Sequence, residues 1–250
     1  MRASVAILGA LAIAASLVQA SSRRGLTRSP RLAFTERPAD LSFGPDERRG
    51  LLRCEATGIP TPSVHWLKNG RPISGPEGRQ LENEEERLAN RGRRTIQSGV
   101  TEARLRIGRP CGDVVYSCVA DNGRKRLIAH AAVAAESGDD DCSDEQAPKG
   151  AQIYAWTRGR FEMEGGAAQL VCRATGQPKP QIAWLDENGE ELVYGGPLDK
   201  ADRFELLSSG DLLVRNNKET ASYFCRAKNG HGEDKVHVFF YSTKLAEETP

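Results

Sequence analysis

The sequence predicts an all-β protein built from two tandem β-sandwiches, and three observations support this. A stretch with Cys, then Ala-Thr-Gly-x-Pro-x-Pro, then Trp occurs twice, over residues 52–67 and 170–185. The Cys-to-Trp separation is 12 in both copies (66 − 54 and 184 − 172). Short apolar or alternating runs bounded by Asn-Gly and Ser-Gly turns follow each copy, as in strands joined by hairpins. A match of this length indicates a duplicated domain.

Length and charge limit the class of protein. The chain has 250 residues, enough for two domains of about 100 residues that each bury a core. Its 38% hydrophobic and 28% charged content is typical of a soluble globular protein. Without Arg2 the chain has 34 basic and 34 acidic residues, a net charge of zero. This balance argues against nucleic acid as a partner.

The first residues predict secretion. Residues 1–20 read as a signal peptide, with a basic start, a short apolar run and a small-residue cleavage site after Ala20. The apolar run is too short to span a membrane. Residues 21–32 form a basic tail, either a solvated segment or a contact for an acidic glycan. Residues 244–250 form a C-terminal tail without the apolar segment of a lipid anchor. We therefore expect an extracellular protein without a membrane span.

The remaining chain divides into two domains and a linker. Domain one is expected over residues 33–137, with strands at 51–56, 64–67, 101–107, 114–120 and 126–134. It shows no helical period. Residues 138–149 form an acidic linker of the kind that is usually solvated. Domain two is expected over residues 150–243, with strands at 168–174, 181–185, 204–207, 212–214, 221–229 and 235–241.

Each domain carries a Cys, a Trp 12 residues later and a Tyr-x-Cys. In an immunoglobulin-like sandwich the disulfide joins two facing sheets, the Trp packs on it, and the Tyr hydroxyl bonds back to the backbone at a corner. The pattern therefore predicts two immunoglobulin-like sandwiches. The residues assigned to these roles are the disulfides Cys54–Cys118 and Cys172–Cys225, the core residues Trp66 and Trp184, and the corner residues Tyr116 and Tyr223.

Two further features belong to domain one alone. Cys111 lies just before the Tyr-x-Cys strand and Cys142 follows the last strand, so a Cys111–Cys142 disulfide would anchor the linker. The Cys-to-Cys spacing is 64 residues in domain one and 53 in domain two, and the additional residues fall in the charged segment 75–98. This segment is either a long solvated loop or a binding loop. Its residues 91–94 (Arg-Gly-Arg-Arg) also resemble a basic processing site.

The sequence contains no recognisable catalytic pattern. The four histidines are not at metal-ligand spacing, and nucleophile-elbow, HExxH, phosphate-loop and CxxC motifs are absent. We therefore expect a binding protein rather than an enzyme, with no metal and no cofactor.

The repeated Leu-x-Cys-x-Ala-Thr-Gly-x-Pro-x-Pro phrases resemble I-set immunoglobulin domains. Together with residues 104–107, 153–157, 210–215 and 224–229, they are similar to the neural/ectodermal development factor family of arthropods. These are secreted, ecdysone-inducible proteins with two immunoglobulin domains. The phrases are also similar to small secreted two-domain proteins of nematodes.

The arthropod resemblance implies sequestration of insulin-like peptide hormones outside the cell, which restrains insulin-receptor signalling. The nematode resemblance implies a neuronal alternative, in cell adhesion, axon guidance or the maintenance of axon position, through cell-surface receptors. Aromatic side chains are good anchors for an apolar peptide. Candidate ligand contacts are Trp156, Phe239 and Tyr241, and the alternative is that these aromatics pack the junction between the domains.

Overall fold

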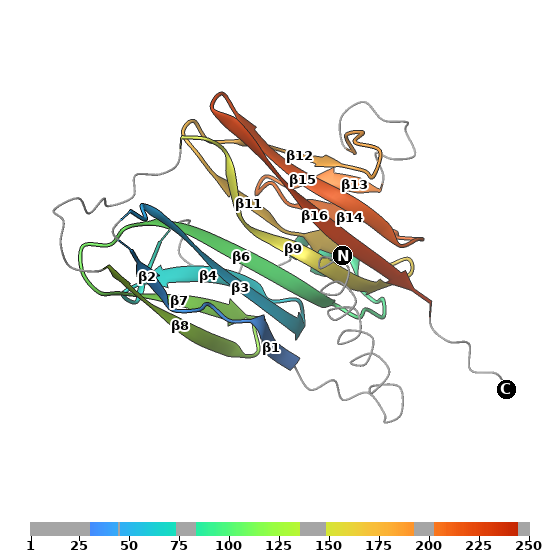
Figure 1. Ribbon diagram of the computed structural model, residues 1–250. Coiled ribbons are helices and arrows are strands. Elements are labelled where there is room, and N and C mark those ends of the chain that lie inside the picture. Colours follow the sequence, from blue (N-terminus) through green and yellow to red (C-terminus); the bar gives the residue numbers. More distant parts are fainter. Residues whose placement is uncertain (1–30, 45, 74–83, 136–148, 193–202, 245–250) are drawn as a thin grey trace, which may run out of the picture.

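The computed structural model describes residues 31–44, 46–73, 84–135, 149–192 and 203–244 (Figure 1). The expected signal peptide with its cleavage site at Ala20, nearly all of the basic tail and the acidic linker, Cys142, and residues 245–250 lie outside the described residues.

The described chain is almost entirely β, and the strands expected from the sequence are confirmed except that the one expected at 168–174 is split at Val171 into β10 and β11, which lie in different sheets. The strands form three sheets, with orders β1-β3-β6-β9-β16-β15-β12, β10-β14-β13 and β2-β8-β7-β4-β5, and β11 pairs with β9 beside the first. Their bounds are β1 Arg31–Glu36, β2 Leu41–Phe43, β3 Arg49–Ile59, β4 Ser63–Lys68, β5 Arg71–Pro72, β6 Ser98–Gly108, β7 Val114–Asp121, β8 Arg126–Ala135, β9 Gln152–Met163, β10 Ala168–Leu170, β11 Cys172–Thr175, β12 Gln181–Leu185, β13 Phe204–Leu206, β14 Leu212–Val214, β15 Ala221–Asn229 and β16 Gly232–Thr243.

The first sandwich places β1, β3 and β6 against the sheet formed by β2, β8, β7, β4 and β5. The Cys54–Cys118 disulfide joins β3 to β7, with an S–S distance of 1.98 Å. Trp66 is buried in the same cluster as this disulfide, as the Cys-to-Trp spacing predicts. Along β3 the core residues Leu52, Cys54 and Ala56 alternate with residues of the outer face, because successive residues of a strand point to opposite faces.

The second sandwich places β12, β15 and β16 against β10, β14 and β13. The Cys172–Cys225 disulfide links β11 to β15, with an S–S distance of 2.01 Å. Trp184 is 2% exposed within this core, and its indole Nε1 donates to the Gly210 carbonyl at 3.0 Å. The repeated stretch is therefore confirmed as the core of both sandwiches.

One sheet runs through both sandwiches, which the repeat does not predict. Strand β6 pairs with β3 on one side and, in antiparallel register, with β9 of the second sandwich on the other. In the second sandwich the corresponding strand β14 pairs with β10 and with β13. In the first sandwich β9 therefore pairs with β6 on the side where, in the second sandwich, β13 pairs with β14. It then pairs in parallel with β16, which continues the sheet. Figure 1 shows β3, β6, β9 and β16 side by side.

The described part of the charged segment 75–98 is not a solvated loop throughout, and its role as a binding loop stays a prediction. Helix α2 (Glu84–Ala89) lies in it, and Glu86 is 2% exposed. The Asn90 side chain that follows exchanges two hydrogen bonds with the backbone of Ala167, at 2.7 and 2.8 Å. These residues are therefore part of the contact between the two sandwiches rather than a solvated loop. The expectation of no helix in this region is wrong, because a helix of six residues is too short to show a periodic pattern.

A buried ion network closes the junction. The Arg160 guanidinium is 1% exposed and donates to Glu86 at 2.5 Å and to Glu162 at 3.0 Å. Glu86 also accepts from the Gln169 amide at 2.7 Å, and Glu162 accepts from the Ile96 amide at 2.6 Å. Burial raises the pKa of Glu86, while the Arg160 charge and the Gln169 amide oppose that rise. Both carboxylates thus compensate the buried cation.

The predicted tyrosine corners and the predicted third disulfide are confirmed only in part. The Tyr223 hydroxyl is buried without a hydrogen bond to any described backbone group, so the predicted tie is wrong for this residue. Arg203, held by Glu219 at 2.9 Å, lies beside it, and burial raises the Tyr223 pKa. Tyr116 lies in the first core. Cys111 is disulfide-bonded, but its predicted partner Cys142 lies outside the described residues, so this pairing stays a prediction.

We expect Glu86→Ala to lower the free energy of unfolding by about 3 kcal/mol, because it leaves the buried Arg160 charge with one carboxylate fewer. Glu84→Ala is the matched control. Glu84 lies in the same helix, is exposed and pairs with the exposed Arg87, so its loss should change stability by less than about 0.5 kcal/mol. Equal midpoints for both variants in urea unfolding would contradict the role of the network.

Candidate functional site

The register of the shared sheet builds one row of side chains across both sandwiches. Val100 on β6 pairs with Thr57 on β3 and with Gly159 on β9. Gly159 also pairs with Phe239 on β16, which pairs with Ser222 on β15. Directly paired residues point to the same face of a sheet. Thr57, Val100, Gly159, Phe239 and Ser222 therefore form a row on the face that we call the shared-sheet face.

Aromatic side chains flank this row on both sides. Phe161 pairs with Tyr241, and their ring centroids are 5.6 Å apart. Tyr241 is 39% exposed. On the other side Phe224 pairs with His237 at 5.1 Å between ring centroids, and the Lys235 ammonium lies 4.2 Å from the Phe224 ring. The second-sandwich part of the shared-sheet face is thus rich in aromatic rings.

Gly159 is the one position of the row without a side chain. A Cβ atom at this position would have no described neighbour nearer than the Phe239 carbonyl oxygen, at 3.9 Å. Its φ lies outside the left-handed region, so any residue type could adopt this backbone. Gly159 is itself buried and Val100 is 7% exposed, so the accessible part of the row lies on its second-sandwich side, at Phe239.

A local irregularity in β9 shapes the face. Gly159 pairs with Val100 and Thr157 with Thr101, so Arg158 has no partner on β6. A bulge of this kind shifts the alternation by one residue. Trp156 pairs with Glu102 on β6, and Phe161 pairs with Ser98. Because of the shift, Trp156 and Phe161 point to the same face of the β6–β9 pair although they are five positions apart.

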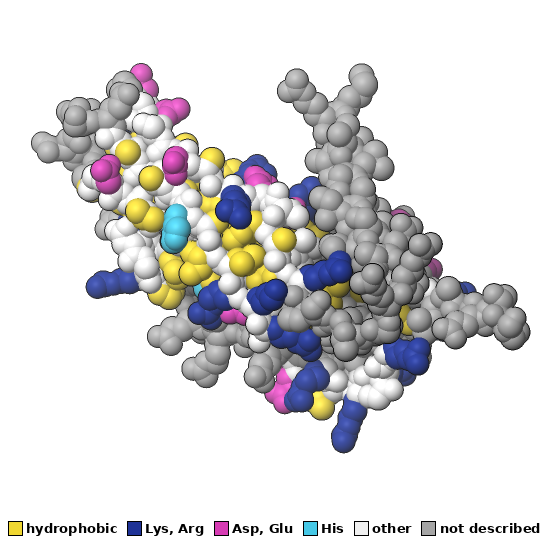
Figure 2. All heavy atoms as spheres, turned by 90° about the horizontal axis from the view of Figure 1, so that it is seen from below, with side chains coloured by type: hydrophobic (Ala, Val, Ile, Leu, Met, Phe, Trp, Pro, Cys, Tyr) yellow, Lys and Arg dark blue, Asp and Glu magenta, His cyan; other side chains and the backbone are white. Residues whose placement is uncertain are grey.

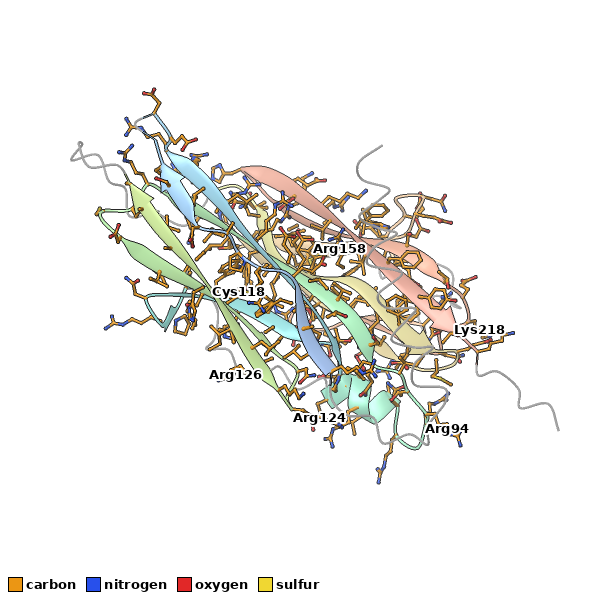
Figure 3. The ribbon with its side chains drawn as sticks, turned by 60° about the horizontal axis from the view of Figure 1, so that its bottom comes forward. Arg94, Cys118, Arg124, Arg126, Arg158 and Lys218 are labelled. Carbon is orange, nitrogen blue, oxygen red and sulfur yellow. A yellow bond between two sulfur atoms is a disulfide. The ribbon has the colours of Figure 1, made fainter. Side chains whose placement is uncertain are left out.

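Ion pairs neutralise the first-sandwich part of the face. Arg158 donates to Glu55 at 2.5 Å and lies 3.7 Å from Glu102, which is also 3.8 Å from Arg53 (Figure 3). Burial raises the pKa of Glu102, and Arg158 opposes that rise. Burial, then the Arg158 charge, lowers the pKa of His237, so this imidazole is neutral at pH 7. The face offers aromatic groups and compensated charges.

The structure separates the three candidate ligand contacts. Tyr241 and Phe239 lie on the shared-sheet face. Trp156 is 5% exposed and packs in the second core, with the Arg104 guanidinium 4.5 Å from its ring centroid. Arg104 also lies 3.4 Å from Asp234. Trp156 is therefore a junction residue, and its expected ligand contact is not supported by its position.

Sequence reasoning missed most of the face. Gly159, Val100 and the Phe224–His237 pair could be assigned to it only from the pairing of β9 with β6 and β16. Alternation along β16 did place Phe239 and Tyr241 on one side, two residues apart. The bulge at Arg158 leaves no signal in a single sequence.

The described ranges contain neither a candidate metal site nor a candidate membrane span. No group of three His, Cys, Asp or Glu side chains there could hold a metal ion. No helix in these ranges is long and apolar enough to cross a membrane.

Comparison with known proteins gives the family. The immunoglobulin domain family matches residues 42–122 and 155–229. Zwei Ig domain protein zig-4 of Caenorhabditis elegans is 34% identical over 212 residues, covering 82% of this chain and 78% of that protein. Zwei Ig domain protein zig-3 of the same organism is 31% identical over 240 residues, covering 93% and 89%.

An insect protein is similar in sequence and in fold. Neural/ectodermal development factor IMP-L2 of Drosophila melanogaster is 26% identical over 222 residues, covering 87% of this chain and 79% of that protein. The crystal structure of IMP-L2 matches with a TM-score of 0.62 at 24% identity, covering 88% of this chain and 98% of that one. This chain belongs to the immunoglobulin domain family, as a two-domain member similar to the nematode Zwei Ig domain proteins and to IMP-L2.

Proposed function

We propose that this chain is a secreted binding protein that sequesters insulin-like peptides and so restrains insulin-receptor signalling. The observation that carries the proposal is the row of side chains that crosses both sandwiches. Phe239 belongs to this row, and the aromatic rings of Tyr241 and Phe224 lie beside it. The relation to IMP-L2 over most of both chains supports it, together with the resemblance to the family of that developmental factor.

The chemistry of the shared-sheet face suits an apolar peptide surface. Rigid aromatic rings supply contact area at a low cost in side-chain entropy, and they dominate the energetics of many interfaces. The charges nearest the row are already paired, so a ligand would not have to strip water from an isolated ion. Because the row lies on paired strands, the binding groups are held in place before the peptide arrives.

We expect Phe239→Ser and Tyr241→Ser each to weaken binding of an insulin-like peptide by about tenfold or more, because each removes an aromatic anchor. Titration calorimetry of the mature protein against a panel of such peptides measures this. Val115→Ser and Ile128→Ser are matched controls, since these exposed apolar residues (44% and 48%) lie on the other sheet of the first sandwich. Absence of heat with every peptide, and of competition with the receptor, would exclude the proposed function.

A side chain added at Gly159 provides an independent test. We expect Gly159→Lys to abolish peptide binding without unfolding the protein, because its Cβ would make only an ordinary contact with the Phe239 carbonyl oxygen, at 3.9 Å, while its long side chain would project from the row. Gly230→Lys is the control: this glycine lies in the turn between β15 and β16, and its Cβ would have no neighbour within 4 Å. Unchanged peptide affinity in Gly159→Lys would place the binding surface elsewhere.

A second candidate function is adhesion at neuronal surfaces, and one observation favours it. The outer side of the β7–β8 sheet exposes Val115 and Ile128, and Ile128 pairs with Val119. Figure 2 views the molecule from below and shows yellow apolar side chains grouped around a histidine on this side. If this face mediates adhesion, coated beads should aggregate, and Ile128→Ser should prevent aggregation. Dispersed beads and a strictly monomeric sedimentation profile would argue against adhesion by self-association.

A further inference from the structure

Two exposed basic turns lie at one end of the first sandwich. The first turn follows α2 and carries Arg91, Arg93 and Arg94. The second joins β7 to β8. It carries Arg124 and Lys125, and Arg126 follows as the first residue of β8. All six side chains are exposed. Seen from below in Figure 2, dark-blue Lys and Arg side chains are more widespread than magenta Asp and Glu.

A buried asparagine fixes each turn, Asn90 through its main-chain carbonyl and Asn122 through its side chain. Asn90 is 7% exposed, and its side chain is hydrogen-bonded to the backbone of Ala167. Its main-chain carbonyl accepts from the Arg93 amide at 2.9 Å. Asn122, 3% exposed, donates to the Ile59 carbonyl at 3.3 Å. Its side-chain oxygen accepts from the Arg124 and Lys125 amides at 3.2 and 2.9 Å.

The glycine within each turn takes up the reversal of the chain, with φ of 76° at Gly92 and 77° at Gly123. Glycine adopts positive φ without steric cost. The backbone that carries both sets of cations is therefore already ordered.

A chain of contacts brings the two turns to the same end. Asn122 bonds to Ile59 at the end of β3, and two residues later Thr61 donates to the Gln97 carbonyl at 3.2 Å. Arg160 bonds to Thr61 and to Glu86 of α2. Figure 3 shows Arg124 and Arg94 on either side of this short helix.

Carboxylates neutralise little of this charge. Arg126 pairs with Asp121 at 2.9 Å. Within the part of the chain that the structure describes, Arg91, Arg94, Arg124 and Lys125 make no ion pair. Arg93 donates to the Gly165 carbonyl at 2.8 Å, which orients its guanidinium without cancelling its charge. The acidic residues of α2 lie in its first turn, before the basic turn, and Glu84 contacts Arg87.

We propose that the two basic turns form a binding site for a sulfated glycosaminoglycan. Guanidinium groups bind tetrahedral oxyanions through two parallel hydrogen bonds, so arginine suits sulfate groups better than lysine does. An extended chain with repeated sulfates can contact both turns at once. The ordered backbone lowers the entropic cost of binding. The site is distinct from the shared-sheet face, and it would retain the protein at cell surfaces or in the matrix.

Heparin-affinity chromatography and calorimetry with a heparin decasaccharide test the proposal. The wild-type protein should bind at physiological salt. The pair Arg91→Ser/Arg94→Ser and the pair Arg124→Ser/Lys125→Ser should each weaken binding about tenfold or more, since each removes two charge-assisted contacts. These variants keep Arg93 and Arg126, which contact the protein itself. Binding of the insulin-like peptide should be unchanged in both pairs, so this site and the proposed function can fail separately.

A matched control removes the same charge elsewhere. Arg49 and Arg106 are exposed at the opposite end of β3 and β6, about 30 Å away at ~3.3 Å per residue. The pair Arg49→Ser/Arg106→Ser should leave heparin elution unchanged. An equal loss of affinity in this control, or equal binding of desulfated heparin, would overturn the proposal. Binding to phosphatidylserine vesicles without binding to heparin would overturn it in favour of a membrane surface.

Discussion

The main-chain pairing of β6 with β9 is the constraint on which the rest of the structure depends. Six residue pairs join the strands, from Ser98 opposite Phe161 to Ala103 opposite Ala155. An unpaired edge of this length would expose a row of backbone donors and acceptors. Because β9 covers this edge, the second sandwich completes the sheet of the first. The two domains are therefore joined through backbone hydrogen bonds as well as side-chain contacts.

The buried ion network is a consequence of this pairing. Arg160 pairs with Gly99, a position without a side chain, and its guanidinium reaches Glu86 and Glu162 inside the junction. Charged groups are stable in such a place only when every charge has partners. A shift of β9 by one residue would turn Arg160 and Glu162, which both lie on β9, away from Glu86 of α2 and break the network. Any other register of β9 would leave a buried charge without its partner. The network therefore selects the observed register as well as stabilising the junction.

The sequence predicts the two cores well and the junction poorly, for a physical reason. The cores repeat the same Cys and Trp spacing, and each strand shows its own alternation, as Thr101 to Ile107 does. Nothing in that alternation tells which strand lies beside β6. Arg160, Glu86 and Glu162 resemble surface charges, because burial of a compensated ion depends on residues far apart in sequence. The placement of Trp156 was open for the same reason, since the bulge at Arg158 decides which way it points.

Rigidity at the junction is what both proposed binding surfaces require. The shared-sheet face has residues from both domains in one row, and a hinge between the domains would separate Val100 from Phe239. The basic turns depend on the same contacts, because Asn90 bonds to Ala167 of the second sandwich and α2 is held by Arg160. The two surfaces use different side chains on one ordered framework. A peptide and a polyanion bound to them would therefore not compete for contacts, and neither would have to order the domains before binding.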